Sequence, residues 1–357
     1  MTQSRLSARF RLAALAALLI PLGLSQLLSP AHAQDAPLTI ATWGGAYTDT
    51  LTEAYAEPFT AETGIPVQFV DAPGGFNAML EAQVKAGNVT WDLVDVGEED
   101  AVAMIDAGHL QPLPDDLKAE LIAAVGEENV TDYGVSFASY GSVIVCNQAA
   151  AEACPTNAAE FWDVENFPGR RAMYGDGWSE NLMYALLADG VAKEDLFPLD
   201  VDRAFAKLDE LKPHINVWWT TGDQSQQIFR DEEVVMGIMW DGRAHGLREQ
   251  GVDVVLSFEG SPISRDLLVV PADAPNAEAA FDFLRWYATH PEGGKIWIEQ
   301  IGYGVANPDA YAEVAPEITA DMGGSPDNMA RGVISDVEWA RENRETVLPR
   351  WTEWLAS

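Results

Sequence analysis

The amino-acid sequence predicts an α/β fold in which mainly parallel sheets are flanked by helices. Segments typical of strands and of helices alternate along almost the whole chain, as in parallel sheets with crossover helices on both faces. A strand near the start of the chain ends at Gly44-Gly45, where the backbone can turn sharply. The 357 residues suffice for two domains, and 48% hydrophobic residues can fill a sizeable core.

The stretch from residue 38 to residue 47 is the expected start of the fold and of a ligand site. Residues 38–40 are apolar or β-branched, as in a buried strand, and a segment with helical periodicity follows the two glycines. Ligands of open α/β sheets bind beyond the carboxyl ends of the strands, which is where Trp43, Gly44 and Tyr47 lie. Trp43 would offer a ligand a flat apolar wall; the alternative is that it belongs to the core.

The remaining elements follow from hydrophobic periodicity and from glycines or prolines at their ends. The expected strands are 65–70, 91–96, 143–145, 234–240, 252–258 and 267–270. The expected helices are 76–86, 99–106, 180–188, 201–211, a segment capped by Asn276, and 291–301. The C-terminal fifty residues are expected to be helical, with Trp339, Trp351 and Trp354 as packing residues.

The N-terminal 33 residues have the features of an export signal. Three arginines precede an apolar run at 12–24, and Ala31-His32-Ala33 fits a cleavage site before Gln34. A membrane anchor is the alternative, but the run is short and contains a proline and a glycine. We therefore expect an exported protein of the periplasm.

The mature chain would be strongly acidic. Removal of residues 1–33 takes away three arginines and no acid, which changes the formal charge from −35 to −38. Such a charge excludes nucleic acid and anionic membranes as natural partners and favours encounter with cations. A general solubilising surface is an alternative explanation for the acidity.

Two cysteines, Cys146 and Cys154, lie close together in a chain expected in an oxidising compartment. We expect them to form a disulfide, because no histidine nearby completes a zinc site. No metal or cofactor is expected.

Motifs of common enzyme classes are absent from the sequence. There is no Gly-x-Ser-x-Gly elbow, no phosphate-binding loop with lysine and no His-Glu-x-x-His motif. The histidines of the mature chain are isolated from one another in sequence. A non-enzymatic protein is therefore expected, with an exported hydrolase that uses two carboxylates as a remote alternative.

Several short motifs together resemble one family. The chain is similar to periplasmic solute-binding proteins of ABC importers, in the branch that includes spermidine- and putrescine-binding proteins. The motifs are residues 42–47, Phe59 with 63–67, 91–94, 140–142, 161–163 with 167–171, 239–243, 301–303 and 338–354.

The resemblance implies a two-lobed type II periplasmic binding protein fold with the ligand in a cleft between the lobes. Lobe one would comprise 34–143 plus 263–305, and lobe two 144–262 plus 306–357, with crossings at 143–145 and near 257–265. The protein would be a monomer that captures a small solute and delivers it to a membrane permease.

The resemblance also implies which residues bind the ligand. Polyamine binders hold a cation between aromatic walls and carboxylates, which is sound physically because ammonium groups are attracted to both. The matching positions here are Trp43 with Gly44, Tyr47, Trp240, Asp176, Glu180 and Asp266. Gly97 and Glu99 stand where a serine and a tyrosine are expected, and Glu99 is a further acid that could face the cleft and bind the ligand.

One departure from the family pattern concerns ligand charge. Arg243 follows Trp240-Asp241-Gly242, where close polyamine binders have a small residue. An arginine in the cleft could hold a carboxylate by two hydrogen bonds, so the ligand could be zwitterionic or anionic. Arg243 could instead pair with Asp241 or Glu249 at the surface, and Glu180 could simply occupy a favourable position in the first turn of its helix. We favour an amine ligand, since Arg243 would be outnumbered by acids.

Overall fold

The computed structural model describes residues 36–72 and 75–357. The predicted export signal and its cleavage site lie outside these ranges. Within them, none of the helices combines the length and the apolar character needed to cross a bilayer.

Ten strands are joined by hydrogen bonds in the described part of the chain. Their order is β2-β1-β3-β9-β4-β7-β5-β6, with β10 beside β9 and β8 beside β4. The bounds are β1 (Leu38–Thr42), β2 (Val67–Asp71), β3 (Leu93–Gly97), β4 (Gly134–Asn147), β5 (Arg171–Tyr174), β6 (Ile215–Trp219), β7 (Met236–Trp240), β8 (Val254–Ser257), β9 (Pro262–Val269) and β10 (Val333–Ile334).

The helices lie between these strands, as the alternating pattern predicts. They are α1 (Ala46–Leu51), η1 (Thr52–Ala56), α2 (Glu57–Thr63), α3 (Phe76–Ala86), α4 (Glu98–Asp106), α5 (Asp115–Val125), η2 (Glu127–Asn129), α6 (Ala158–Trp162), α7 (Trp178–Ala188), η3 (Lys193–Asp195), α8 (Val201–Leu211), η4 (Lys212–His214), α9 (Gly222–Arg230), α10 (Asp241–Glu249), α11 (Ala277–Thr289), α12 (Pro291–Ile301), η5 (Pro308–Tyr311), α13 (Pro316–Thr319), α14 (Pro326–Arg331) and α15 (Val337–Ala356).

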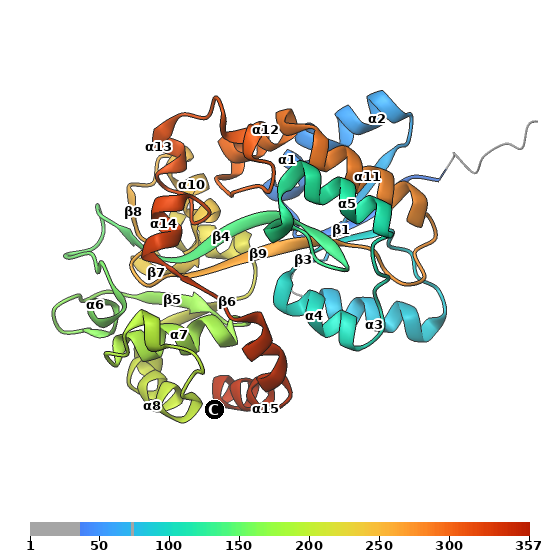
Figure 1. Ribbon diagram of the computed structural model, residues 1–357. Coiled ribbons are helices and arrows are strands. Elements are labelled where there is room, and N and C mark those ends of the chain that lie inside the picture. Colours follow the sequence, from blue (N-terminus) through green and yellow to red (C-terminus); the bar gives the residue numbers. More distant parts are fainter. Residues whose placement is uncertain (1–35, 73–74) are drawn as a thin grey trace, which may run out of the picture. The chain divides into compact units, whose positions relative to one another are not determined.

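Two long strands connect the parallel parts of the sheet. The pairs β1–β2, β1–β3, β5–β6 and β5–β7 are parallel, as predicted, whereas β3–β9, β4–β9, β4–β7 and β4–β8 are antiparallel. Residues 134–141 of β4 pair with β9, and residues 142–147 pair with β7 and β8. Figure 1 shows β4 and β9 side by side between the two groups of parallel strands. The sheets are therefore more mixed than the sequence predicts.

The strands alternate between two apolar cores, since successive side chains of a strand point to opposite faces. Leu38, Ile40 and Leu93 belong to the core that includes residues of α1, α11 and α12. Ala41 and Val94 face a separate core with residues of α3 and α4. A third core holds α7, α8 and α15 together.

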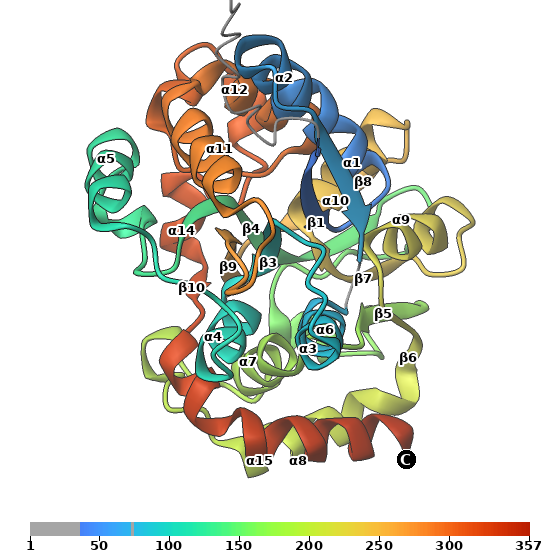
Figure 2. The ribbon, with the colours of Figure 1, turned by 90° about the vertical axis from the view of Figure 1, so that its right-hand side faces the viewer.

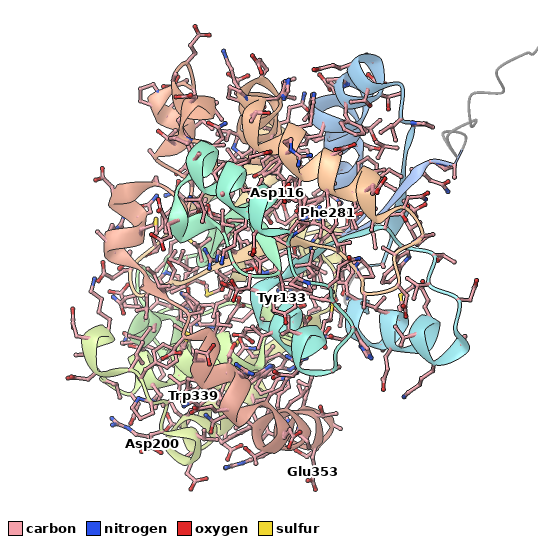
Figure 3. The ribbon with its side chains drawn as sticks, turned by 45° about the vertical axis from the view of Figure 1, so that its right-hand side comes forward. Asp116, Tyr133, Asp200, Phe281, Trp339 and Glu353 are labelled. Carbon is pink, nitrogen blue, oxygen red and sulfur yellow. A yellow bond between two sulfur atoms is a disulfide. The ribbon has the colours of Figure 1, made fainter. Side chains whose placement is uncertain are left out.

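Helix α15 joins the third core to α4. Trp339, labelled in Figure 3, packs on Trp178 of α7 with ring centroids 5.9 Å apart. Arg344 and Arg341 of the same helix pair with Asp100 and Asp106 of α4 at 2.7 and 2.6 Å. Figure 2 shows α15 running below α4 and α7. The predicted packing role of Trp339 is confirmed.

Cys146 and Cys154 form a disulfide, as predicted. Cys146 is the penultimate residue of β4, and Cys154 lies in the loop before α6. The bond ties this loop to the end of the strand that both groups of strands share.

Candidate ligand-binding site

The turn between β1 and α1 requires glycine. Gly44 and Gly45 have φ angles of 87° and 64°, which favour glycine over other residues. A Cβ atom on Gly45 would lie only 2.4 Å from a carboxylate oxygen of Asp223, at the start of α9. The turn thus allows α9 to approach and places Trp43 and Tyr47 on either side of it.

A small cavity lies beside this turn. Trp43, Tyr47, Trp240, Arg243 and Asp266, all predicted as ligand-binding residues, line it together with Tyr140 and Tyr303. The space open to the centre of a water molecule is about 10 Å³, which is room for about one water. An amino-acid-sized ligand can enter only if the walls move apart. Gly44 shapes the turn but does not line the cavity.

Aromatic rings form the walls of the cavity and contact one another. Trp43 and Trp240 meet edge to face with centroids 5.7 Å apart, and Tyr140 is 6.1 Å from Trp240. Trp240 also contacts Trp219 and Tyr174 at 4.9 and 5.1 Å. The faces of such rings attract cations and pack on alkyl chains.

Two carboxylates form the acidic end of the site. Asp266 of β9 lies opposite Gly97 of β3, and Asp95 is two residues before Gly97 on the same face of the strand. Because Gly97 has no side chain, nothing separates the two acids along the sheet face; a Cβ there would be 3.7 Å from Asp266 Oδ1. Thr42 Oγ1 donates to Asp95 Oδ2 at 3.0 Å.

Several polar atoms around these acids are buried without a hydrogen-bond partner in the described structure. They are the Oδ1 atoms of Asp95 and Asp266, Trp43 Nε1 and the hydroxyl of Tyr47. Tyr47 and Trp43 nevertheless lie close enough to Asp95 and Asp266 to favour the ionised form of both acids. Buried polar groups normally have well-formed hydrogen bonds, which these four atoms lack.

Burial raises the pKa of both acids. The pKa of Asp95 reaches about 7, with the nearby hydroxyls of Tyr47 and Thr42 acting in the opposite direction. The pKa of Asp266 lies well above its usual range, first through burial and then through the charge of Asp95. Two such carboxylates resist being ionised together unless a cation joins them.

Arg243 forms the basic end of the site. It is buried on α10, and its Nη1 donates to Asp223 Oδ1 at 2.9 Å. Arg243 therefore does not pair with Asp241 or Glu249, the alternative partners. Its guanidinium lies over the start of α9, where a Cβ on Gly222 would be 2.3 Å from Arg243 Nε. Burial raises the pKa of the Tyr303 hydroxyl, and the nearby charge of Arg243 acts in the opposite direction.

Asp241 has a structural place instead. It is fully buried at the start of α10 and accepts hydrogen bonds from the backbone N–H groups of Gly242, at 2.9 Å, and Gly323. Burial raises its pKa to about 8. It does not line the cavity, and it holds the loop before α14 against the strands.

The other predicted carboxylates line a larger groove. Glu99, Asp176 and Glu180 lie in a groove of about 1990 Å³ that shares Trp43, Tyr140 and Trp240 with the small cavity. The three rings thus stand between groove and cavity. Tyr133, labelled in Figure 3, also lines the groove.

Glu99 and Glu180 have specific partners in this groove. Ser179 Oγ donates to Glu99 Oε1 at 2.6 Å and Ser142 Oγ to Glu180 Oε2 at 2.8 Å. Desolvation, the largest effect, raises the pKa of each acid to about 7 despite these bonds. The hydrogen bond from α7 to α4 makes Glu99 a contact between elements rather than a residue of the cavity.

Two residues that line the cavity, Tyr140 and Tyr303, and the buried Asp95 behind it were not among the predicted ligand-binding residues. Tyr140 and Tyr303 belong to motifs that carry the family resemblance, but no charge singled them out. Asp95 could have been recognised from the sequence. In the strand 91–96 it lies on the same face as Trp91 and Leu93, so a carboxylate falls on a buried face. Burying an ionised acid there costs free energy of folding unless a partner compensates its charge, so such a residue is often kept for a function.

Comparison with known proteins gives a consistent picture of the chain. The profile of the bacterial extracellular solute-binding protein family matches residues 54–323. A gamma-aminobutyric acid-binding protein of Pseudomonas aeruginosa is 31% identical over 331 residues, which cover 91% of this chain and 93% of that protein. The spermidine/putrescine-binding periplasmic protein of Escherichia coli is 27% identical, over 88% of this chain and 90% of that protein.

Solved structures of similar proteins share the fold. The Atu4243 GABA receptor is 34% identical with a TM-score of 0.80, over 90% of this chain and 98% of that one. MotA of Agrobacterium tumefaciens B6 in complex with glucopine is 28% identical with a TM-score of 0.83, over 90% and 100%. AttC of A. tumefaciens C58, in an open unliganded conformation, is 34% identical, but its TM-score is 0.66 over 89% and 99%.

Proposed function

The chain belongs to the bacterial extracellular solute-binding proteins and is the non-enzymatic substrate-binding component of an ABC importer, and from this premise we propose that its ligand is a small zwitterionic amino acid. The ammonium and the carboxylate of this ligand stand at opposite ends of a short alkyl chain, as in 4-aminobutanoic acid (GABA). The observation that carries the proposal is that a basic residue, Arg243, and an acidic residue, Asp266, line the same cavity without forming an ion pair with each other.

Each part of such a ligand has a complementary group. The guanidinium of Arg243 can hold the carboxylate by two hydrogen bonds, with the Tyr303 hydroxyl beside it. Asp266 and the aromatic faces of Trp43 and Trp240 suit the ammonium and the chain that carries it. Only a zwitterion satisfies both ends, since a diamine brings a cation to Arg243 and a dicarboxylate brings an anion to Asp266.

The relatives support the same choice. A GABA-binding protein matches at 31% identity and a spermidine/putrescine-binding protein at 27%. GABA as the ligand therefore replaces the polyamine favoured by sequence analysis alone.

A polyamine remains the second candidate because of the groove. Glu99, Asp176 and Glu180 add carboxylates beyond the aromatic rings, where a longer cation could extend. Burial, the larger effect, and the charge of Asp100 both raise the pKa of Asp176, and burial raises those of Glu99 and Glu180 to about 7.

Ligand capture involves closure of two lobes in this proposal. The lobes are 34–143 plus 263–305 and 144–262 plus 306–357, with the site between them. Strand β4 changes partners at residues 141–142, and β10 beside β9 adds a further connection. The tight cavity and the higher TM-score to the glucopine complex than to the open unliganded protein support a closed arrangement here.

The protein acts outside the cytoplasmic membrane in the same proposal. Export follows from the signal at 1–33, cleavage after Ala33 leaves Gln34 first, and the monomer hands its solute to the membrane permease. Mass spectrometry of the periplasmic fraction tests the cleavage; a stable membrane-held form that begins at Met1 would contradict it.

Calorimetry with three ligands of similar length tests the ligand. Wild-type protein is titrated with GABA, putrescine and succinate, and we expect GABA to bind most tightly. Arg243→Ala and Asp266→Asn should each weaken GABA binding by at least about thirtyfold, since breaking a buried charge pair costs about 2–5 kcal/mol. Arg230→Ala, at an exposed position of α9 outside the cavity, is the matched control and should leave affinity unchanged.

The polyamine alternative has a distinct outcome. If putrescine binds more tightly than GABA, and Arg243→Ala leaves or improves putrescine binding while Asp266→Asn removes it, the ligand is a diamine. Tight binding of succinate alone would reject both amine candidates.

A further inference from the structure

We infer that Asp95 and Asp266 form one ammonium site that holds a single proton in the unliganded protein and exchanges this proton for the cationic group of the ligand. Each binding event would then release one proton to solvent. The inference deepens the proposed function, because it concerns how the acidic end of the same site accepts the ammonium.

The sheet register brings the two carboxylates together. Gly97 pairs with Asp266 across the antiparallel β3–β9 ladder, and Asp95 precedes Gly97 by two residues on the same face. Side chains in this diagonal relation lie within reach of one another. Asp95 is wholly buried and Asp266 is 4% exposed, so neither charge is compensated by water.

The two acids share a set of neighbouring donors that leaves room for a stronger one. Asp95 Oδ2 accepts the Thr42 hydroxyl, while the Oδ1 atoms of Asp95 and Asp266 make no hydrogen bond of ordinary geometry in the described structure. Tyr47 and Trp43 lie beside both acids and favour their ionised forms, but the Tyr47 hydroxyl and Trp43 Nε1 likewise make no hydrogen bond of ordinary geometry. An ammonium has three donors and no acceptor, so it can bond to both carboxylates, with the ring of Trp43 beside it.

The surroundings supply no cation that would keep both acids ionised. Arg243 is the one lysine or arginine among the described residues that lines the cavity, and its Nη1 is paired with Asp223. The other titratable groups that interact with the pair, from α1, β4, β5, α11 and the segment after α12, are Tyr47, Tyr140, Tyr174, Tyr287 and Tyr303. All of these are neutral or acidic at pH 7.

The exchange balances in charge and protons. The pair with one proton carries a charge of about −1, because like charges held together share a proton. An incoming ammonium replaces that proton, both carboxylates become ionised, and the site again carries about −1 in total. The proton passes to the buffer, and no bond of the ligand is broken.

The exchange links affinity to pH. Below the pH at which the pair loses its proton, the association constant for GABA should rise by about tenfold per pH unit, since one proton is displaced per ligand. Above that pH the affinity should level off. A site with a permanently ionised acid would show no such slope between pH 5 and 8.

Calorimetry in buffers of different ionisation enthalpy tests the exchange. GABA is titrated into full-length mature protein at pH 6 in phosphate, imidazole and bis-Tris buffers, and the slope of apparent enthalpy against buffer enthalpy should give release of about one proton. Asp95→Asn should reduce the release and shift the pH dependence to lower pH, because the charge of Asp95 is one of the causes that raise the pKa of Asp266. Asp71→Asn, an acid of the same sheet outside the cavity, should keep both.

A spectroscopic measurement separates the exchange from the identity of the ligand. Glu99, Glu180 and Asp241 also hold protons at pH 6, so the infrared spectra of unliganded and liganded protein are subtracted to cancel the bands of these groups. The difference should contain one carbonyl band of a protonated carboxyl that belongs to unliganded wild type alone, and Asp266→Asn should remove this band from the difference. If GABA does not bind, the proposed function fails, and the exchange is tested with putrescine, which also brings an ammonium.

The inference is overturned if the unliganded protein has no such band, or if an ammonium ligand binds with no proton release. It is supported only if band loss and proton release both depend on Asp95 and Asp266. Since both readouts come from wild type as well, a variant that fails to fold leaves the test intact.

Discussion

Arg243 illustrates how the meaning of one residue depends on its neighbours. Its Nη1 pairs with Asp223, an acid that is 59% exposed, while its own side chain is 7% exposed. Tyr303 lies on the other side, and Arg243 favours the ionised form of its hydroxyl. The guanidinium is therefore held in place by partners at the surface and remains available to an anion in the cavity.

Tyr303→Phe should weaken binding of the carboxylate end alone. Loss of a hydrogen bond to a charged group costs about 1.5–3 kcal/mol, or roughly 10- to 150-fold in affinity for GABA. Tyr55→Phe is the control, because the buried Tyr55 hydroxyl has no hydrogen-bond partner among residues 36–72 and 75–357 and Tyr55 does not line the cavity. Calorimetry checks both variants; equal losses would show that Tyr303 acts only through general packing.

Gly45→Ala should impair both stability and ligand binding. The backbone of Gly45, with φ 64° and ψ −144°, is accessible essentially to glycine alone, so alanine there should cost about 1–3 kcal/mol of stability. In addition, the alanine Cβ would collide with the carboxylate of Asp223. Gly64→Ala is the control, since Gly64 has φ 77° but nothing within 4 Å.

Urea unfolding and calorimetry distinguish the two glycine variants. Gly64→Ala should lose about 1–2 kcal/mol of stability and no affinity. If Gly45→Ala binds GABA as wild type does, the approach of α9 to this turn does not matter for binding.

Individual strands and helices account for what the sequence could and could not predict. Alternation of apolar segments was sufficient to place β1, β3 and β7, and the glycines after β1 predicted its turn. The pairing of β4 with two groups of strands could not be predicted, because register across distant segments leaves no local pattern. For the same reason Asp95 and Asp266, 171 positions apart in sequence, could not be recognised as a pair.

The loop after β4 depends on its disulfide. Cys146 and Cys154 are eight positions apart, and closing so short a loop contributes about 2.5 kcal/mol in the chain-entropy description. Cys146→Ala/Cys154→Ala should lower the free energy of unfolding by about this amount, measured in urea without reductant. Wild type with reductant should lose a similar amount; no loss in either case would contradict the estimate.

The molecule as a whole buries an unusual number of acids with raised pKa values. Asp95, Glu99 and Glu180 have pKa values of about 7, and Asp241 of about 8, mainly through burial. In the folded state these groups retain protons that the unfolded chain has already lost. The folded state therefore binds more protons than the unfolded chain between about pH 4 and pH 8.

Stability of the unliganded protein should fall as pH rises through that window. The contribution of each raised acid is complete near its unfolded pKa and is lost as pH passes the folded value. Urea unfolding at pH 5, 6, 7 and 8 measures the trend. Glu180→Gln should reduce the slope, and Glu249→Gln, on the exposed end of α10, should not; stability that rises over this range would refute the prediction.

The contact between Trp43 and Trp240 gives the protein an optical property. Their rings meet across the cavity at 5.7 Å, and a ligand that enters must separate them. Indole emission depends on the polarity and the neighbours of the ring, so occupancy should change the intrinsic fluorescence without any added dye. The other ten tryptophans also contribute to the emission, and Trp43→Phe should reduce the ligand-dependent change, because Trp240 then remains as the tryptophan of the cavity lining. The same residues that enclose the solute thus make the protein a sensor of it.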